Sequence, residues 1–323
     1  MLGCLRQPLG DLCISRPVSR LNWGIPLPFD PAYVTYVWFD ALINYVTAAG
    51  YLSDPERFAR LWPQAMHLIG KDILTTHAVY WPTMLQAARL PQPKTIWAHG
   101  WWLSRNAKMS KSLGNVVKPL DLAEIYGVDA FRYFLMRDMT LGRDADFDEG
   151  GLAHRYHGDL ANDLGNLLHR LVNMIGRYSA GQIPTPGEPG AEDTALREHC
   201  LALAPQIERQ IETCAINAAL AQTMSAIRDI NRYLEQSAPW SQAKSGRAER
   251  VATILYTAAE ALRLTSILLY PVMPDKIAQL WHRLGWQPPT PLRDGLAWGQ
   301  LRPGERVTAG EPLFPRIDRV ADG

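Results

Sequence analysis

From about residue 151 onward, apolar residues recur with the period of about 3.6 residues that is typical of α-helices. Further stretches of this kind predict helices over roughly 192–213, 215–236 and 248–270, and a tail rich in Pro and Gly follows residue 285. Long helices with short connections predict an antiparallel bundle that ends in an irregular segment. The clearest apolar stripe contains Leu160, Leu164, Leu167, Leu168, Leu171, Val172 and Ile175.

The pattern before residue 150 is different, because short β-branched or aromatic runs alternate with helical ones. Alternation of this kind predicts a parallel α/β sheet. Three strands are too few for a complete doubly wound sheet, so this part resembles half of such a fold. The predicted class is therefore α/β followed by all-α. The predicted elements are a buried strand over 33–39, a helix over 40–49, strands over 66–69 and 95–102, and a helix over 74–90 with a kink or late start at Pro82.

Composition adds limits on class and compartment. The chain has 323 residues, of which 47% are hydrophobic and 20% charged, which is typical of folded domains. Its 33 Lys and Arg against 32 Asp and Glu give a net charge of +1, which argues against coating nucleic acid through bulk charge. None of the four cysteines forms a CxxC pair, so neither a disulfide framework nor a zinc site is predicted.

Membrane association is not predicted either. The most apolar run, 258–273, is interrupted by Glu260, Arg263 and Pro271, and it is too short to cross a bilayer. The first residues lack the basic and then apolar pattern of a signal peptide. We therefore expect a cytoplasmic protein.

One short segment carries distinctive chemistry. Lys108-Met109-Ser110-Lys111-Ser112 places two lysines three residues apart with serines beside the second. Ammonium groups, hydroxyls and loop amides can together bind the oxygen atoms of a polyphosphate. A solvated basic loop is the alternative for any two lysines at this spacing.

These five residues, KMSKS, form the full signature loop of class I aminoacyl-tRNA synthetases, and Ala98-His99-Gly100-Trp101 resembles the strand that leads into it. Two further segments resemble methionyl-tRNA synthetases in particular. They are the run from Tyr36 to Ala41 (YVWFDA) followed by Tyr45, and Gly70-Lys71-Asp72 followed by His77 and Trp81-Pro82. The resemblance covers nearly the whole chain.

The resemblance implies a methionine pocket and an ATP site. Methionine has a polarizable thioether that packs against aromatic rings, and a hydroxyl or imidazole could address its sulfur. A carboxylate is the natural partner of an ammonium group or a ribose hydroxyl. Each aromatic or histidine taken alone could equally be a core residue. The implied methionine-binding residues are Trp38, Ala41, Tyr45, Asp72, His77 and Trp81. The implied ATP-binding residues are Lys108, Met109, Ser110, Lys111, Ser112, Asp72 and His99, with Lys108 and Lys111 as the catalytic pair.

The helical half carries candidate RNA contacts. Amide and guanidinium groups can recognise base edges, and aromatic rings stack on unpaired bases. Asn166 and Arg170 lie four residues apart and away from the leucine stripe, and Trp240 follows Pro239. In the resembled family these positions contact the anticodon. The alternative is an ordinary solvated helix face with a Trp packed at a helix end.

The resemblance also shapes the expected organisation. We expect the second half of the catalytic domain over 1–115, a connecting region over 116–150 and an anticodon-binding bundle with its tail over 151–323. The family's first nucleotide-binding segment is absent from this chain, so we expect the chain alone to be inactive. A truncated gene model, a split gene with a separate N-terminal half and a real deletion all stay open as its origin.

The implied activity is that of a methionine–tRNA ligase, which uses ATP with Mg²⁺ to activate methionine and transfers it to methionine tRNA. A non-catalytic tRNA-binding fragment is one alternative. Another is a class I synthetase for leucine, isoleucine, valine or cysteine, although the segments around Trp38 and Trp81 argue against it.

Overall fold

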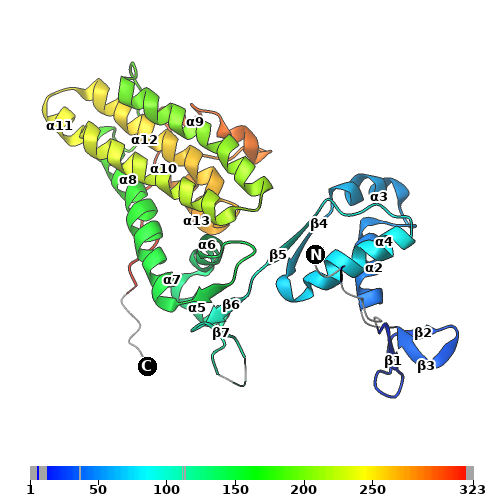
Figure 1. Ribbon diagram of the computed structural model, residues 1–323. Helices are drawn as coiled ribbons and strands as arrows, with labels where there is room; N and C mark the ends of the chain where they lie inside the picture. The colour runs from blue at the N-terminus through cyan, green and yellow to red at the C-terminus, as the bar shows by residue number, and fades with distance from the viewer. Residues whose placement is uncertain (1–5, 7–12, 36–37, 111, 113, 318–323) are drawn as a thin grey trace. The chain divides into compact units, whose positions relative to one another are not determined.

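The computed structural model describes residues 6, 13–35, 38–110, 112 and 114–317. The chain forms two compact units, Met1–Trp101 and Trp102–Gly323 (Figure 1). The first mixes strands and helices and the second is mainly helical, so the predicted order of α/β followed by all-α is confirmed.

The first unit contains two small sheets. One is antiparallel, with strand order β1-β3-β2, and the other is a parallel pair of β4 and β5. The strands are β1 (Ser15–Pro17), β2 (Ile25–Leu27), β3 (Asp30–Thr35), β4 (Met66–Gly70) and β5 (Thr95–His99). The helices are α2 (Trp38–Ala49), α3 (Pro55–Leu61) and α4 (Trp81–Ala87), with short helical turns η1 (Trp62–Gln64), η2 (Lys71–Ile73) and η3 (Thr76–Tyr80).

Two strand predictions were partly wrong. The predicted buried strand over 33–39 is β3, which ends at Thr35 and buries only Val34, while Trp38 already begins α2. Aromatic residues suit a half-exposed strand and a helix start equally well, and Asp40 in the first turn favours the helix. The predicted strand over 95–102 is two strands, because β5 ends at His99 and a new strand starts at Trp102.

The parallel pair packs on the helices. The core beneath it consists of Leu42, Val46, Ala49, Trp62, Trp81 and Leu85. The expected irregularity near Pro82 is present as the π-helical turn η3, which precedes α4. Proline lacks an N–H and crowds the carbonyl four residues earlier, so the wider turn relieves both problems.

The second unit begins with a small sheet and continues as a bundle. Its strands are β6 (Trp102–Ser104), β7 (Ala107–Lys108) and β8 (Ala145–Phe147), in the order β7-β6-β8. Its helices are α5 (Pro119–Tyr126), α6 (Val128–Asp138), α7 (Glu149–Arg155), η5 (Tyr156–Gly165), α8 (Asn166–Tyr178), α9 (Ala191–Glu212), α10 (Ile216–Ser237), α11 (Pro239–Lys244), α12 (Ala248–Leu269), α13 (Pro274–Arg283) and η6 (Leu292–Leu296).

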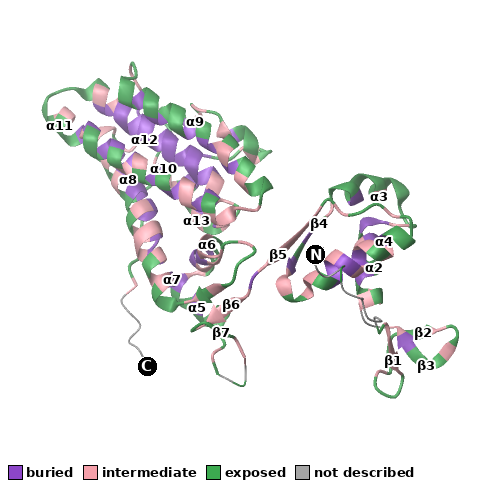
Figure 2. Cartoon of the chain, in the orientation of Figure 1, coloured by how far each residue is buried: buried purple, intermediate pink, exposed green. Residues whose placement is uncertain are grey.

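Helix α12 is the core of the bundle, and its neighbours α8, α9 and α10 surround it. Figure 2 shows buried residues concentrated along it. Among the described residues it is one helix long and apolar enough to cross a membrane by length and composition, but 89% of its most apolar window is buried inside the protein. It therefore serves as a core helix here.

A buried ion pair on α12 holds the C-terminal tail. Arg263 donates to the Glu260 carboxylate through Nε at 3.0 Å and Nη2 at 2.6 Å, and neither side chain is exposed. The same carboxylate accepts three backbone N–H groups, from Gly299, Gln300 and Leu301, at 2.8–3.0 Å. The guanidinium also donates to the carbonyls of Gly295 and Ala297. The predicted irregular tail is therefore ordered by side chains rather than by regular structure.

The region 102–150 shares its core with the bundle. Leu122, Tyr126, Tyr133 and Phe134 belong to the same hydrophobic cluster as the residues of α8 and α12. Packing thus divides the chain after Trp101. The boundaries at 115 and 150 describe functional segments and stay a prediction.

The first long helix of the bundle is irregular. Its N-terminal part, η5, is π-helical over ten residues and passes into regular α-helix at Asn166. Leu160, Leu164 and Leu168 are all at most 1% exposed, so the predicted stripe faces the core across this junction.

Candidate functional site

In the first unit, polar side chains gather at the carboxyl ends of the parallel strands. β4 ends at Gly70 and β5 ends at His99, and these two residues are partners in the register. Asp72 lies two residues beyond the end of β4, and a Cβ placed on Gly70 would collide with its carboxylate and lie 3.8 Å from His99 Cε1. Ligands of open α/β sheets bind at these strand ends. Asp72 and His99, both predicted from the sequence, are therefore brought together where a nucleotide or amino acid would bind.

The orientation of His99 is fixed by its neighbour. Its Nδ1 lies 2.7 Å from the Gly100 carbonyl oxygen, which can only accept, so Nδ1 carries the proton. In the neutral ring Nε2 is then a hydrogen-bond acceptor. Beside it, the Lys71 ammonium lies 4.2 Å from the centre of the Trp101 ring.

The predicted methionine-pocket residues form an aromatic cluster. The Tyr45 hydroxyl lies 2.9 Å from His77 Nε2, and the Trp38 and His77 rings meet edge to face at 6.1 Å. Trp81 packs 6.0 Å from the Tyr45 ring. Ala41 is exposed one helical turn before Tyr45 on α2, so it offers space on the same face.

The hydrogen bonds in this cluster have a fixed direction. His77 Nδ1 lies 3.0 Å from the Ile73 carbonyl and must donate to it, so the neutral ring accepts the Tyr45 hydroxyl proton at Nε2. That proton is therefore already used inside the protein. A thioether placed here would be held chiefly by contact with aromatic surfaces and not by a donated hydrogen bond.

Sequence reasoning missed His67. It lies on the buried face of β4, 5% exposed, and its Nε2 accepts the Trp81 indole N–H at 3.1 Å. Burial, and secondly the nearby His77, lower the pKa of His67 below 6.5, so the ring is neutral and fixes Trp81. The only available signal was a histidine at an inward position of a short strand.

The stability of the first unit should therefore depend on pH through His67. Between pH 6.5 and its lower folded-state pKa, the unfolded chain binds a proton that the folded chain does not, so stability falls as pH falls. We expect urea midpoints, followed by tryptophan fluorescence, to decrease from pH 6.5 to 5.5 and this group to contribute no change from 6.5 to 8. His67→Gln should flatten that slope, while the exposed-site control His154→Gln should retain it. Equal slopes for all three proteins would contradict the role of His67.

In the second unit, the lysine–serine segment forms a loop closed by Asn115. The Asn115 side chain accepts the Ser110 N–H at 2.8 Å and donates to the Lys108 carbonyl at 3.3 Å. The Ser110 and Ser112 hydroxyls lie 2.7 Å apart, and Lys108 is exposed. Asn115 is a second residue that sequence reasoning did not assign. Its contacts fix the Ser110 N–H and the Lys108 carbonyl relative to each other.

The structure describes some of the other loop residues and not all of them. Lys111 lies outside the described residues, so its predicted role is untouched by the geometry. Met109 is half-buried beside Lys108. Gly114 has φ of 65°, and nothing lies within 4 Å of the position that a Cβ would take, so the backbone conformation, not space, favours glycine there.

The predicted anticodon residues lie on neighbouring elements. Asn166 is exposed at the start of α8, and Arg170, one turn later, forms an ion pair with Glu235 of α10 at 3.5 Å. Trp240, on α11 just beyond the end of α10, is 37% exposed although tryptophan is usually buried. The arginine side chain is 29% exposed and Glu235 is 65% exposed, so this pair is weak and leaves the guanidinium available.

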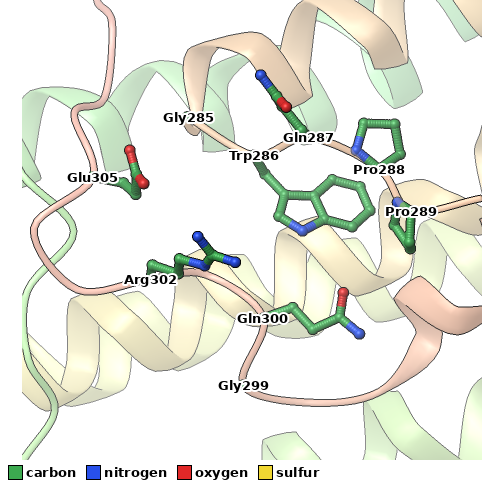
Figure 3. Close-up of a pocket in the computed structure, with 9 residues that line it drawn as sticks. All are labelled: Gly285, Trp286, Gln287, Pro288, Pro289, Gly299, Gln300, Arg302 and Glu305. Carbon is green, nitrogen blue, oxygen red and sulfur yellow. The ribbon is translucent and has the colours of Figure 1, made fainter.

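Where the structure describes the chain, no group of three or more His, Cys, Asp or Glu is placed to hold a metal ion. A cavity of about 630 Å³ lies between the tail and the end of α13, with Trp286, Arg302 and Glu305 around it (Figure 3). It contains none of the predicted site residues.

A parallel strand pair with polar groups at its carboxyl ends, a lysine–serine loop and a helical bundle are the parts of a class I aminoacyl-tRNA synthetase. In agreement, the family model described as tRNA synthetases class I (M) matches residues 1–172. A second model, the anticodon binding domain of methionyl tRNA ligase, matches residues 183–321.

Curated relatives identify the family more closely. The chain is 41% identical over 319 residues to the methionine–tRNA ligase of Thermotoga maritima, covering 98% of this chain and 50% of the relative. It is 45% identical over 325 residues to that of Deinococcus radiodurans, covering 100% of this chain and 47% of the relative. The chain belongs to the methionine–tRNA ligase family and spans about half the length of these relatives.

A solved structure agrees in fold. The Mycobacterium tuberculosis methionyl-tRNA synthetase in complex with methionyl-adenylate matches with a TM-score of 0.91 and 37% identity. The match covers 98% of this chain and 62% of that chain. The predicted Rossmann-like half-domain followed by an anticodon-binding bundle is thereby confirmed.

Proposed function

We propose that this chain contributes the methionine-contacting wall, the signature loop and the anticodon-binding bundle of a methionine–tRNA ligase. The observation that supports this most is the cluster of Trp38, Tyr45, His77 and Trp81, in which His77 bonds to the carbonyl of Ile73, the residue next to Asp72. It joins aromatic surface for a thioether to a carboxylate for an ammonium group. The cytoplasm, predicted as its location, belongs to this proposal, because the relatives are bacterial ligases.

The proposed chemistry has two steps. An oxygen of the methionine carboxylate attacks the α-phosphorus of ATP, the bond to the β-phosphate breaks, and pyrophosphate leaves. A terminal ribose hydroxyl of methionine tRNA then attacks the acyl carbon, and AMP leaves. Lys108 and Lys111 would stabilise the charge that builds on pyrophosphate, and Mg²⁺ would enter with ATP as part of the substrate.

The proposed roles at the nucleotide follow from position. Asp72 and His99 lie at the strand ends, so they would contact methionyl-adenylate through the ammonium group and the adenosine. The Ser110 and Ser112 hydroxyls and the loop amides would add hydrogen bonds to phosphate oxygens. Asn115 would position these groups without touching the substrate.

Methionine-dependent exchange of labelled pyrophosphate into ATP tests the catalytic part. We expect the purified chain alone to give no exchange, and we expect exchange when the preceding segment of a relative is joined to it. Robust exchange by the chain alone would mean that its own residues take the place of the nucleotide-binding segment that precedes this region in the family. No exchange by the joined protein would contradict the assigned pocket and loop.

Trp240→Ala should weaken binding of methionine tRNA by about 5- to 150-fold, because stacking of one base on an aromatic ring contributes about 1–3 kcal/mol. Trp240→Phe is the matched control, since it keeps an aromatic face. Fluorescence anisotropy with labelled tRNA measures both, and circular dichroism checks that the bundle is intact. An unchanged affinity in Trp240→Ala would contradict the assigned contact.

A non-catalytic tRNA-binding function is the second candidate. It is favoured by the well-packed bundle, whose hydrophobic cluster is made of residues of the second unit. Binding of methionine tRNA without any pyrophosphate exchange, even in the joined protein, would support it.

A further inference from the structure

The C-terminal tail closes a cavity against the end of α13. This cavity of about 630 Å³ has two walls, which are the segment 285–289 after the helix and the tail over 299–305 (Figure 3). A volume of this size suits a small organic molecule or the end of a peptide. Both walls belong to the second unit, and neither contains a residue assigned here to methionine, ATP or tRNA.

The tail wall is held in place by contacts at both of its ends. At one end, the Glu260 carboxylate accepts the three consecutive backbone N–H groups over 299–301. At the other end, the Ile183 N–H donates to the Glu305 carbonyl at 2.8 Å. The cavity is therefore formed before a ligand arrives, and little loss of conformational entropy would oppose binding.

Trp286 offers an unused hydrogen-bond donor to this cavity. Its side chain is 7% exposed, and its indole N–H has no acceptor among the residues that the structure describes. The neighbouring Trp281 differs, because its N–H donates to Ser266 Oγ at 2.7 Å. The Trp286 nitrogen is not sealed inside the protein, so it reaches the cavity that its ring lines. The Arg263 guanidinium, 4.8 Å from the ring centre, draws electron density from the indole and makes its N–H a stronger donor.

Two side chains of the tail add a cation and an acceptor beside this N–H. Figure 3 shows the Arg302 guanidinium extending from the tail toward Trp286, with the Gln300 amide on the same side of the cavity. Within the described part of the chain, no ion pair holds Arg302. Gln300 donates through Nε2 to the Asp294 carbonyl at 2.6 Å, so its Oε1 is the atom that can accept from a ligand.

We propose that this cavity binds an α-carboxylate, either at the C-terminus of a peptide or on a free amino acid. The carboxylate would accept from the Arg302 guanidinium and the Trp286 N–H, and the nitrogen next to it would donate to Gln300 Oε1. A sulfate ion is a poorer occupant, because it has no donor for Gln300. The site is independent of the proposed function, since it shares no residue with the assigned methionine, ATP and tRNA contacts.

Isothermal titration calorimetry of the full 323-residue chain tests this site with two carboxylates, N-acetyl-trialanine and free alanine. The C-terminal amide of the acetylated peptide is the matched ligand and should bind at least tenfold more weakly. Arg302→Gln should weaken binding about tenfold or more, because it removes a charge-assisted hydrogen bond. The matched variant is Arg293→Gln, at an exposed arginine of η6 outside the cavity lining. Proton–nitrogen NMR spectra should show one shifted indole N–H signal, which Trp286→Phe removes.

The expected result is binding of a carboxylate by the wild type and by Arg293→Gln. Tighter binding of the acetylated peptide assigns the site to a peptide C-terminus, and tighter binding of alanine assigns it to a free amino acid. Equal affinity for the amide or for sulfate would overturn the proposal, as would unchanged affinity in Arg302→Gln or no binding of either carboxylate at millimolar concentration. Neither ATP nor tRNA is added, so failure here is distinguishable from failure of the proposed catalysis.

Discussion

Replacing Lys111 by alanine is expected to lower the rate of methionine-dependent pyrophosphate exchange by about 10²–10³-fold, which is the usual effect of removing one preorganised contact to developing charge. The chemistry of the lysine side chain explains why the expected loss of rate is this large. An ammonium group three residues from Lys108 would face oxygen atoms whose charge increases only as the phosphorus–oxygen bond breaks. Methionine affinity should barely change, because the aromatic cluster that would hold the side chain belongs to another segment of the chain.

The experiment uses the protein joined to the preceding segment of a relative, so that a complete site is available. Lys118→Ala is the matched control, because Lys118 is a nearby lysine, 77% exposed, whose weak ion pair with Asp121 spans 3.7 Å. It should leave the exchange rate and the methionine affinity near the wild-type values. Equal losses of rate and of methionine affinity in Lys111→Ala would refute the assigned role.

Replacing Glu260 by alanine should lower the free energy of unfolding of the bundle by about 3–5 kcal/mol, because it leaves a buried guanidinium without its counter-ion. Three backbone N–H groups of the tail would also lose their acceptor. We therefore expect the tail to be cut by protease between residues 295 and 305 before the helices unfold. Urea titration followed by helical circular dichroism measures the loss.

Glu192→Ala supplies the matched control. Glu192 lies 4.0 Å from Arg250 and is 66% exposed, so its removal should cost less than about 1 kcal/mol. Similar destabilisation by the two substitutions would show that the buried pair is not what holds the tail. A Glu260→Leu and Arg263→Met double variant should recover only part of the stability, since the three N–H groups stay unpaired.

The helical half was the easier part to predict. The helical period of apolar residues, together with the prolines that follow α10 and α12, predicts the bounds of α9, α10 and α12 to within a residue or two. The short strands were harder, because a run such as 33–39 contains residues that favour strands whether or not the segment is buried. Whether such a run continues as a strand depends on what packs against it, which is tertiary information.

The sequence predicted the site residues that belong to a family motif. It did not predict residues whose role is to position another side chain or a loop. Trp38, Tyr45, His77 and Trp81 were chosen by resemblance, and the structure brings them into one cluster. His67 and Asn115 have no motif of their own: one fixes an indole ring and the other closes a loop. His67 accepts a hydrogen bond from Trp81, 14 residues later, and Asn115 accepts one from Ser110, five residues earlier. The spacing of residues in the sequence does not reveal such partners.

The π-helical segment η5 has a consequence for how this chain can vary in length. A regular helix turns by about 100° per residue, so adding or removing one residue before Asn166 would rotate all of α8 by that angle. A deletion would turn Leu167 and Leu171 out of the core, an insertion would turn out Leu168 and Val172 instead, and either change would bury Asn166. Substitutions within Tyr156–Gly165 can be absorbed wherever the side chain faces outward, but insertions and deletions cannot. Family members that keep the same recognition face should therefore keep this segment at constant length while its outward residues change freely.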